Sequence, residues 1–212
     1  MQAIKRFSVF APIIMLGGAV AASAQAPPVN VYFGLGTATD SSNGQQINTF
    51  GDGNLYNTPK INGLFANLGG NLMITPHYGF GGEFSWRTSQ GDYAGLKYRP
   101  MLYDFNAVWQ PAGNKKRVIP EFQAGIGAVD LRYYLSSTAC DQFVGCQTSN
   151  GLLESANHFQ THFSGAARVY LTQHLFLRPA VDVHYVTNFN QFGSNWMPQY
   201  TLGVGYSFGN AE

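Results

Sequence analysis

Apolar and polar side chains alternate along most of this 212-residue chain. Between residues 78 and 88, one set of alternate positions is aromatic or small, and the other set is small or charged. The first set is Tyr78, Phe80, Gly82, Phe84 and Trp86, and the second set is Gly79, Gly81, Glu83, Ser85 and Arg87. Because a β-strand points successive side chains to opposite faces, this pattern predicts a strand with one apolar face and one polar face.

About eight segments carry this alternation, and nearly all of their charges fall on the face that also holds the glycines. The predicted strands cover residues 29–37, 62–74, 78–88, 96–109, 118–129, 158–171, 175–186 and 198–208. Their connections alternate between short polar turns and longer loops, and the two longest loops are predicted at 38–60 and 135–157. An even number of antiparallel strands with this rhythm is typical of an outer-membrane barrel, in which the turns and the loops lie on opposite sides.

These features predict an all-β fold, an eight-stranded antiparallel up-and-down transmembrane β-barrel. Segments of about 9–12 residues suit tilted strands that cross a bilayer, and a closed barrel satisfies every backbone polar group in lipid. Aromatic residues near the segment ends, Tyr78, Trp86, Trp109 and Tyr200, are expected in the two interfacial girdles. A soluble antiparallel barrel or sandwich is the alternative, but its outward face should be charged rather than aromatic.

The first residues have the features of a secretory signal peptide. A basic pair, Lys5 and Arg6, precedes an apolar stretch, and the small-x-small sequence Ala-Ser-Ala ends at residue 24. We expect a signal peptide at 1–24 and one barrel domain at 25–212. An uncleaved membrane anchor is the alternative, but the apolar run is short for a span and contains Pro12.

Composition agrees with an exported membrane β-protein. Charged residues make up 11% of the chain and aromatic residues 15%, whereas soluble domains carry about 25% charged residues. The formal net charge of +1 does not suggest nucleic acid as a partner, and no later run of about 18 apolar residues predicts a transmembrane helix.

Cys140 and Cys146 are close together in a polar stretch, so we expect them to form a disulfide in an exported protein. A metal site is the weaker alternative for this pair, because two ligands do not make a site.

Several segments resemble a known group of proteins. Residues 203–208, Gly-Val-Gly-Tyr-Ser-Phe, look like a terminal strand with alternating aromatics, and residues 164–185 look like the penultimate hairpin of a barrel. The glycine-rich inward faces at Gly79, Gly81, Gly125 and Gly127 fit the same group. The mature chain resembles the small eight-stranded outer-membrane barrels of OmpA-like, OmpX-like and OmpW-like type.

This resemblance implies a location and partners. It implies the outer membrane of a Gram-negative-type bacterium, contact with outer-membrane lipid and lipopolysaccharide, and a monomeric state. It also implies that Gly203, Tyr206 and Phe208 form the signal read by the barrel-assembly machinery. Four residues follow Phe208, which departs from the group, where the final aromatic is usually terminal. We expect no peptidoglycan-binding domain after Phe208, so tethering to the cell wall is not implied.

The predicted inward face collects charged and titratable side chains. They are Glu83, Arg87, Asp104, Glu121, His162, Arg168, Arg178, Asp182 and His184. Eight strands leave an interior just wide enough for side chains, and buried charges must pair because an isolated charge costs several kcal/mol. We therefore expect a salt-bridge network that fills the barrel. A gated polar path for ions or small solutes is the alternative, and it uses the same residues.

One motif suggests an enzyme. His162 and Ser164 share the predicted inward face, Asp182 is available on the neighbouring strand, and eight-stranded lipid A deacylases resemble this His-x-Ser arrangement. A serine nucleophile needs the imidazole within hydrogen-bond reach and a carboxylate to hold the imidazole. However, a lipid hydrolase needs its nucleophile to face lipid, and Gly165-Ala166 replaces the Asn-containing context expected after the serine. We expect no catalytic residues, no cofactor and no metal.

The two long polar loops are the third candidate for function, because function on a rigid scaffold usually lies in exposed loops. Adhesion, phage reception or binding of an unidentified partner would take place there. Lys97 and Arg99 are expected near the outer rim, where they either reach lipopolysaccharide phosphates or form an ordinary solvated rim. The sequence thus favours a structural or surface-interaction barrel. A narrow porin-like channel is the alternative, and a lipid A-modifying hydrolase is a remote one.

Overall fold

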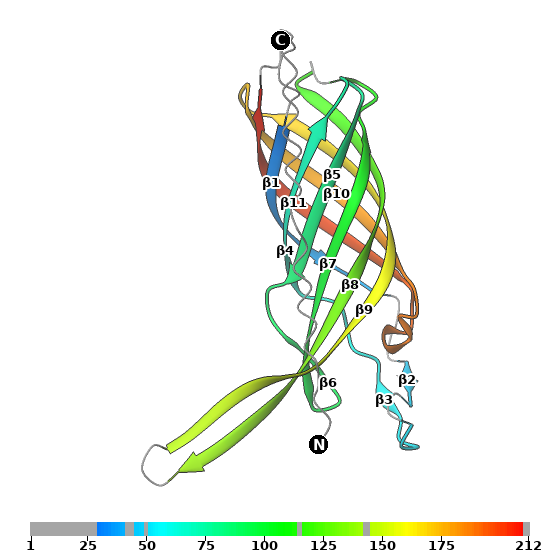
Figure 1. Ribbon diagram of the computed structural model, residues 1–212, viewed down its shortest axis with the longest axis vertical. Coiled ribbons are helices and arrows are strands. Elements are labelled where there is room, and N and C mark those ends of the chain that lie inside the picture. The colour runs from blue at the N-terminus through cyan, green and yellow to red at the C-terminus, as the bar shows by residue number, and fades with distance from the viewer. Residues whose placement is uncertain (1–28, 41–44, 49–50, 114–115, 142–144, 210–212) are drawn as a thin grey trace, which may run out of the picture.

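The computed structural model describes residues 29–40, 45–48, 51–113, 116–141 and 145–209 (Figure 1). The predicted signal peptide at 1–24 and the last three residues, 210–212, lie outside the described residues. The described chain is built almost wholly of β-strands, with one short 3-10 helix, η1 (Asn190–Phe192). Within these ranges no helix is long and apolar enough to cross a membrane.

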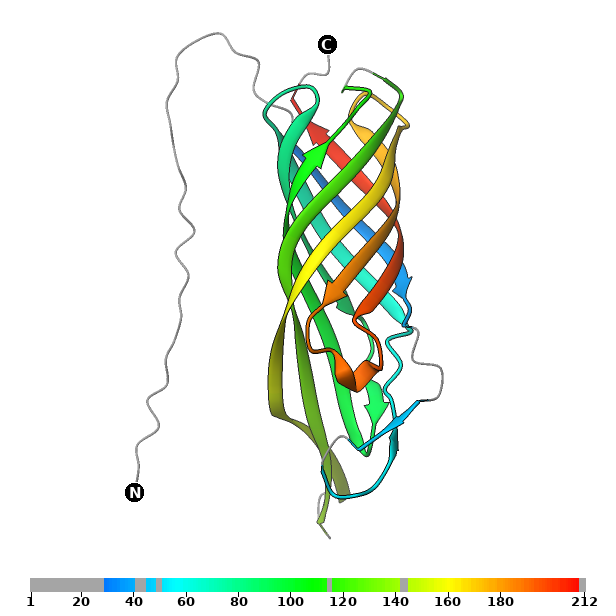
Figure 2. The ribbon, with the colours of Figure 1, turned by 90° about the vertical axis from the view of Figure 1, so that its right-hand side faces the viewer.

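Eight long strands of the described chain form a closed barrel. They are β1 (Val29–Ala38), β4 (Leu64–Met73), β5 (Tyr78–Arg87), β7 (Leu96–Trp109), β8 (Val118–Asp141), β9 (Gly145–Tyr170), β10 (Leu175–Val186) and β11 (Trp196–Phe208). Each pairs antiparallel with its neighbours in sequence, and β1 also pairs with β11, which closes the wall. Figure 2 shows the strands running obliquely around the barrel. The predicted eight-stranded antiparallel up-and-down fold is confirmed.

Short elements decorate one end of this wall. β2 (Gln46–Ile47) pairs with β3 (Tyr56–Asn57), and β6 (Gly91–Tyr93) pairs with the start of β7. We call this end the loop end, and we call the other end, which holds the short connections 74–77, 110–117 and 171–174, the turn end. Two of the predicted strands, 96–109 and 175–186, coincide with β7 and β10.

The prediction of an irregular loop at 135–157 is wrong. β8 and β9 stay paired with each other from the turn end as far as Asp141 and Gly145. Here β8 and β9 are held together by backbone hydrogen bonds to each other, and neither face of the hairpin is buried. Alternation of apolar and polar side chains, which predicted the other strands, is therefore not required in this segment. We call residues 134–141 and 145–152 the arm.

The arm leaves the barrel at a defined point. β7 pairs with β8 only as far as Tyr134, and β10 pairs with β9 only as far as Gln160. The register shifts at this place, because Tyr133 faces Glu154 while Tyr134 faces Leu152. Such a bulge bends a strand and increases its twist. Figure 1 shows the arm swinging away from the barrel beyond this point, and the predicted disulfide between Cys140 and Cys146 joins its two strands near the tip.

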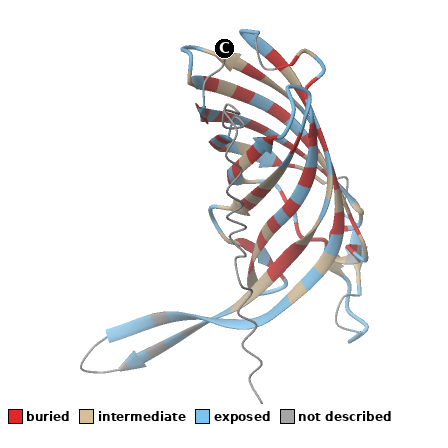
Figure 3. Ribbon diagram, turned by 45° about the horizontal axis from the view of Figure 1, so that its top comes forward, coloured by how far each residue is buried: buried red, intermediate tan, exposed pale blue. Residues whose placement is uncertain are grey.

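Alternating burial along each strand separates the inside of the barrel from its outside (Figure 3). On β11, for example, Gln199, Thr201 and Ser207 are buried while Tyr200 and Leu202 are exposed. The contrast is sharp across the wall, because Phe105 is 75% exposed and Glu121 is 0% exposed. A polar interior with an apolar exterior is the reverse of a soluble domain, and this arrangement suits a lipid surrounding.

Apolar side chains occupy the interior at the loop end. They form one cluster, the apolar cap, made of Ala38, Ile61, Phe65, Tyr93, Tyr98, Leu102, Val129, Leu131, Val186, Phe189, Phe192 and Met197. The ring of Phe192 from η1 stacks on Phe189 at 4.3 Å and meets Tyr98 edge-on at 5.8 Å. At the turn end, Met73, Val108, Ile119 and Phe176 are also buried inside the wall. The polar interior therefore lies between two apolar layers.

Candidate functional site

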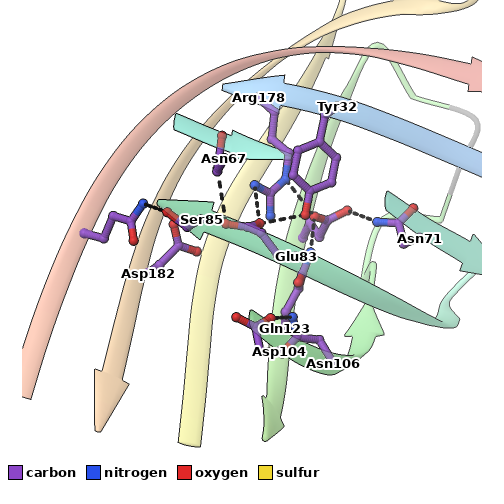
Figure 4. A network of polar contacts seen from close by, with 12 residues as sticks. Tyr32, Asn67, Asn71, Glu83, Ser85, Asp104, Asn106, Gln123, Arg178 and Asp182 are labelled. Carbon is purple, nitrogen blue, oxygen red and sulfur yellow. Dashed lines mark hydrogen bonds and ion pairs between the residues drawn. The ribbon is translucent and has the colours of Figure 1, made fainter. Parts of the chain in front are cut away.

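The polar interior is built from inward positions on every strand of the wall. Strand alternation aims these side chains at one another across the barrel, so residues far apart in sequence meet. Figure 4 shows part of this network. Gln199 of β11, for instance, donates to the hydroxyl of Ser85 on β5 at 2.8 Å, across 114 residues of chain.

Glu121 on β8 accepts the largest number of hydrogen bonds in the network described. It forms ion pairs with Arg168 of β9 and with Arg178 of β10, whose Nε lies 3.1 Å from its Oε1. Three amides also donate to its carboxylate: Gln123 at 2.8 Å, Gln110 at 3.2 Å and Asn71 at 3.3 Å. Two guanidinium groups and three amides thus satisfy one carboxylate that is fully buried, as a buried charge requires.

Glu83 on β5 forms a second centre with Tyr32 of β1. The Tyr32 hydroxyl donates to Glu83 Oε2 at 2.8 Å, and Asn67 donates to Oε1 at 3.1 Å. The Arg178 guanidinium lies 4.2 Å above the Tyr32 ring and 3.7 Å from Glu83. Gly69 makes room for this ring, because a Cβ there would lie 2.4 Å from Tyr32 Cζ.

His162 on β9 links two further carboxylates. Its Nδ1 lies 3.3 Å from Asp104 Oδ1 and its Nε2 lies 3.4 Å from Asp182 Oδ1. Asn106 holds one side of this group, since it accepts from His162 Nδ1 at 2.9 Å and donates to Asp104 at 2.5 Å. The His184 ring stacks on His162 with 4.7 Å between ring centroids.

Eight of the nine predicted lumen residues therefore meet in the interior described, and Arg87 lies apart from them. Arg87 ends β5 near the loop end, where it donates to the Tyr98 hydroxyl at 3.1 Å. It lines a polar rim cavity of about 560 Å³ together with Tyr56, Lys60 and Asp92. The strand pattern predicted the face of Arg87 but not its height, and its height puts it beyond the network.

Sequence reasoning missed the neutral members of the network and the apolar layers. Tyr32, Asn67, Asn106 and Gln123 carry hydrogen bonds to the charged groups. Their inward alternation was the available signal, but they carry no charge and were not singled out. The apolar cap was missed because inward apolar residues look like errors in an alternating pattern.

Ser164 lies inside the barrel, as its face predicted. It is 6% exposed, and it is the cross-strand partner of Asp182. Within the part of the chain that the structure describes, its hydroxyl makes no hydrogen bond, including none to His162. The nucleophile–imidazole contact that acyl transfer requires is therefore not formed, and the serine faces away from lipid.

The predicted assembly signal occupies the end of β11. Tyr206 and Phe208 point outward at the turn end, 43% and 51% exposed, with ring centroids 4.8 Å apart. Gly203 faces Gly34 of β1 at the seam that closes the barrel. Recognition by the assembly machinery stays a prediction.

Three solved structures resemble this fold. A major outer membrane protein of Thermus thermophilus matches with a TM-score of 0.56 and 13% identity, over 86% of this chain and 100% of that chain. OprG of Pseudomonas aeruginosa matches with a TM-score of 0.53 and 14% identity, over 87% and 97%. Ail of Yersinia pestis matches with a TM-score of 0.51 and 13% identity, over 86% and 99%. The fold is that of the small outer-membrane β-barrels. No protein-family model and no curated protein matches the chain.

Proposed function

We propose that this barrel is an integral outer-membrane protein that acts at the cell surface, with the arm as its main contact element and the wall as a rigid anchor. The arm is the observation that carries the proposal. It is a disulfide-linked two-stranded ribbon that swings away from the barrel at the loop end (Figure 1). Among the described strands, none pairs with the outer edges of the arm beyond Tyr134 and Gln160, and such edges can pair with an added strand.

Exposed apolar side chains on and beside the arm support a contact role. Leu135, Leu152 and Leu153 are each about half exposed, at 49%, 57% and 58%. Outside the lipid zone, large exposed apolar side chains grouped together are typical of interaction sites. Ail, which shares the fold at 13% identity, is called an attachment invasion locus protein and was solved with the heparin analogue sucrose octasulfate.

The interior supports an anchor rather than a channel. Glu121, Arg168 and Arg178 are buried and tied to one another, and the apolar cap lies above them at the loop end. A conducting path would need water-accessible polar walls from one end to the other. We also propose no catalytic role for Ser164. Membranes that contain the Ser164→Ala variant should therefore have the same lipid composition as membranes that contain the wild type.

Basic side chains near the loop end support contact with anionic lipid headgroups. Arg99 and Arg132 are cross-strand partners with outward-facing positions on β7 and β8. Acidic groups accompany the basic ones here, since Lys97 pairs with Asp92 at 2.5 Å and Arg132 with Asp130 at 2.8 Å. We propose that this part of the rim lies at the level of the lipopolysaccharide phosphates.

A shortened arm tests the proposal. Ser136 and Asn150 are cross-strand partners, so an Asn-Gly turn in place of residues 137–149 closes the hairpin without changing the wall. Gram-negative cells that display the full barrel should adhere to protein-coated surfaces and to one another more than cells that display the shortened barrel. Equal folding of the two variants is checked by heat-modifiable migration on a gel. If cells that display the full-length barrel adhere no better than cells without the protein, the contact role is contradicted.

Planar-bilayer recording tests the anchor role separately. The purified barrel should insert and stay electrically silent. Discrete, salt-dependent conductance steps would replace the anchor with the channel alternative, whatever the arm does.

A further inference from the structure

Two histidines meet on the inner face of neighbouring strands. His162 of β9 and His184 of β10 are cross-strand partners, so both side chains leave the wall in the same direction. Asp104 of β7 reaches the same place over the glycines of β8, since Gly125 pairs with both His162 and Asn106 and Gly127 pairs with Asp104. One nitrogen of each ring and one oxygen of Asp104 all lie within 4.8 Å of one another, and His162, His184 and Asp104 are 0%, 2% and 4% exposed.

The charges in this part of the interior do not balance. Arg168 and Arg178 lie on Glu121 and Glu83. Among the residues described, Asp104 and Asp182 have only the His162 imidazole within ion-pair distance. Two carboxylates and one protonated imidazole leave an excess negative charge in a buried place, which is costly. A divalent cation held by neutral imidazoles would match the two carboxylates.

Several ligand-type atoms at this place also lack a hydrogen bond of ordinary geometry. In the described chain, neither ring nitrogen of His184 and neither carboxylate oxygen of Asp182 makes a hydrogen bond, although both residues are almost fully buried. Buried polar groups in folded proteins are nearly always satisfied. Imidazole nitrogens and carboxylate oxygens that lack hydrogen bonds are the atoms that a metal ion uses.

We propose that Asp104, His162 and His184 bind a divalent transition-metal ion inside the barrel, with Asp182 beside them as the second compensating charge. Metal–ligand bonds of about 2.0–2.2 Å in a tetrahedral site hold neighbouring ligand atoms roughly 3.3–3.6 Å apart. The widest pair of the group therefore needs to close by about 1.2–1.5 Å, and the stacked rings need to tilt towards a common point. Mixed imidazole and carboxylate ligands select zinc-like ions over magnesium or calcium.

Asn106 supports this assignment from the next layer. It accepts from His162 Nδ1 and donates to Asp104, which fixes the ring and leaves Nε2, 3.4 Å from Asp182 Oδ1, as the nitrogen without a hydrogen bond. Metal-binding histidines characteristically carry such an oriented hydrogen bond on the other nitrogen. The bound ion would join β7, β9 and β10 on the inner face of the wall, over the intervening β8.

Metal retention by the refolded barrel tests the proposal. The mature chain is refolded in detergent with Co²⁺ or Zn²⁺, freed of loose metal, and analysed for metal content and for the visible absorption of low-coordinate Co²⁺. We expect one ion per folded chain. His184→Gln and Asp104→Asn should weaken retention roughly 100-fold or more, since even changes in the supporting layer cost about 10–100-fold. His174→Gln, at the turn between β9 and β10, is the matched control and should bind like the wild type.

A second measurement, NMR of the wild-type barrel with Co²⁺, needs no variant and so does not depend on how well a variant folds. In the wild-type barrel, Co²⁺ should broaden the ring resonances of His162 and His184 and leave those of His77 and His174 sharp. A folded wild-type barrel that retains no stoichiometric ion overturns the proposal. So does equal broadening of all four histidines, or undiminished binding by a folded His184→Gln variant.

Discussion

β8 and β9 each run through two different surroundings, the barrel wall and the arm. A comparison of these two regions shows what stabilises each of them. Inside the wall, both strands have neighbours on each side, and their inward side chains reach a shared polar interior. In the arm, each strand has only the other, and the arm side chains whose burial is described are at least partly exposed. The wall is specified by side-chain contacts across the barrel, whereas the arm is held by backbone pairing and one disulfide. Changes in the wall should therefore cost stability, and changes in the arm should cost contact function.

Removal of Glu121 should have the largest effect on the wall. Glu121→Ala leaves Arg168 and Arg178 without the carboxylate that both contact. Breaking a buried ion pair by removing one partner costs about 3–5 kcal/mol. Urea unfolding in lipid vesicles, followed by tryptophan fluorescence, measures the loss. Glu154→Ala is the matched control, because Glu154 is exposed beyond the point where β10 stops. Equal losses in both variants would mean that the interior network does not stabilise the wall.

A matched pair of glycine substitutions should have an intermediate effect. A Cβ at Gly69 would lie 2.4 Å from the Tyr32 ring, whereas a Cβ at Gly151 in the arm would meet nothing within 4 Å. Gly69→Ala should cost about 1–3 kcal/mol by overpacking, and Gly151→Ala should stay within about 0.5 kcal/mol, as surface changes do. The same urea titration measures both variants. A larger loss at Gly151 would show that the arm contributes to wall stability.

The same contrast explains which parts of the structure were predictable. A wall strand needs one lipid-facing side and one interior side, so alternation alone located β7 and β10 at their observed bounds. The arm has no lipid-facing side and no interior side, so alternation did not predict that β8 and β9 continue into it. The stagger that closes the barrel was not readable either. For this reason the sequence could not predict that Glu83 and Tyr32 face each other, although the Tyr32 hydroxyl donates a hydrogen bond to Glu83 at 2.8 Å.

Removal of the disulfide should affect the arm and spare the wall. Cys140 and Cys146 lie beyond the last pairing of β8 with β7. Replacement of both by serine should shift the unfolding free energy of the wall by no more than about 0.5 kcal/mol. Limited proteolysis of intact cells should cut the variant faster within the arm than the wild type. Cleavage at the same rate would mean that backbone pairing alone keeps the arm ordered.

The smallest effect is expected in the short hairpin of β2 and β3, outside the wall. Asp52 accepts a hydrogen bond from the Tyr56 hydroxyl at 2.7 Å and two from Asn54, at 3.0 and 3.1 Å. These bonds favour the charged carboxylate, so the pKa of Asp52 lies below its ordinary value, and the bond from Tyr56 is the main cause.

A group with a depressed pKa stabilises its surroundings above its unfolded pKa and loses that effect as the pH falls through the folded value. The hairpin should therefore hold its conformation at neutral pH and loosen below about pH 4, the ordinary range of an aspartate. Carboxyl titration followed by NMR should place the Asp52 midpoint below that range and move it upward in Tyr56→Phe. Because Asp52 is exposed, the wall should unfold identically in both proteins. An unchanged midpoint in Tyr56→Phe would assign the low pKa to Asn54 instead.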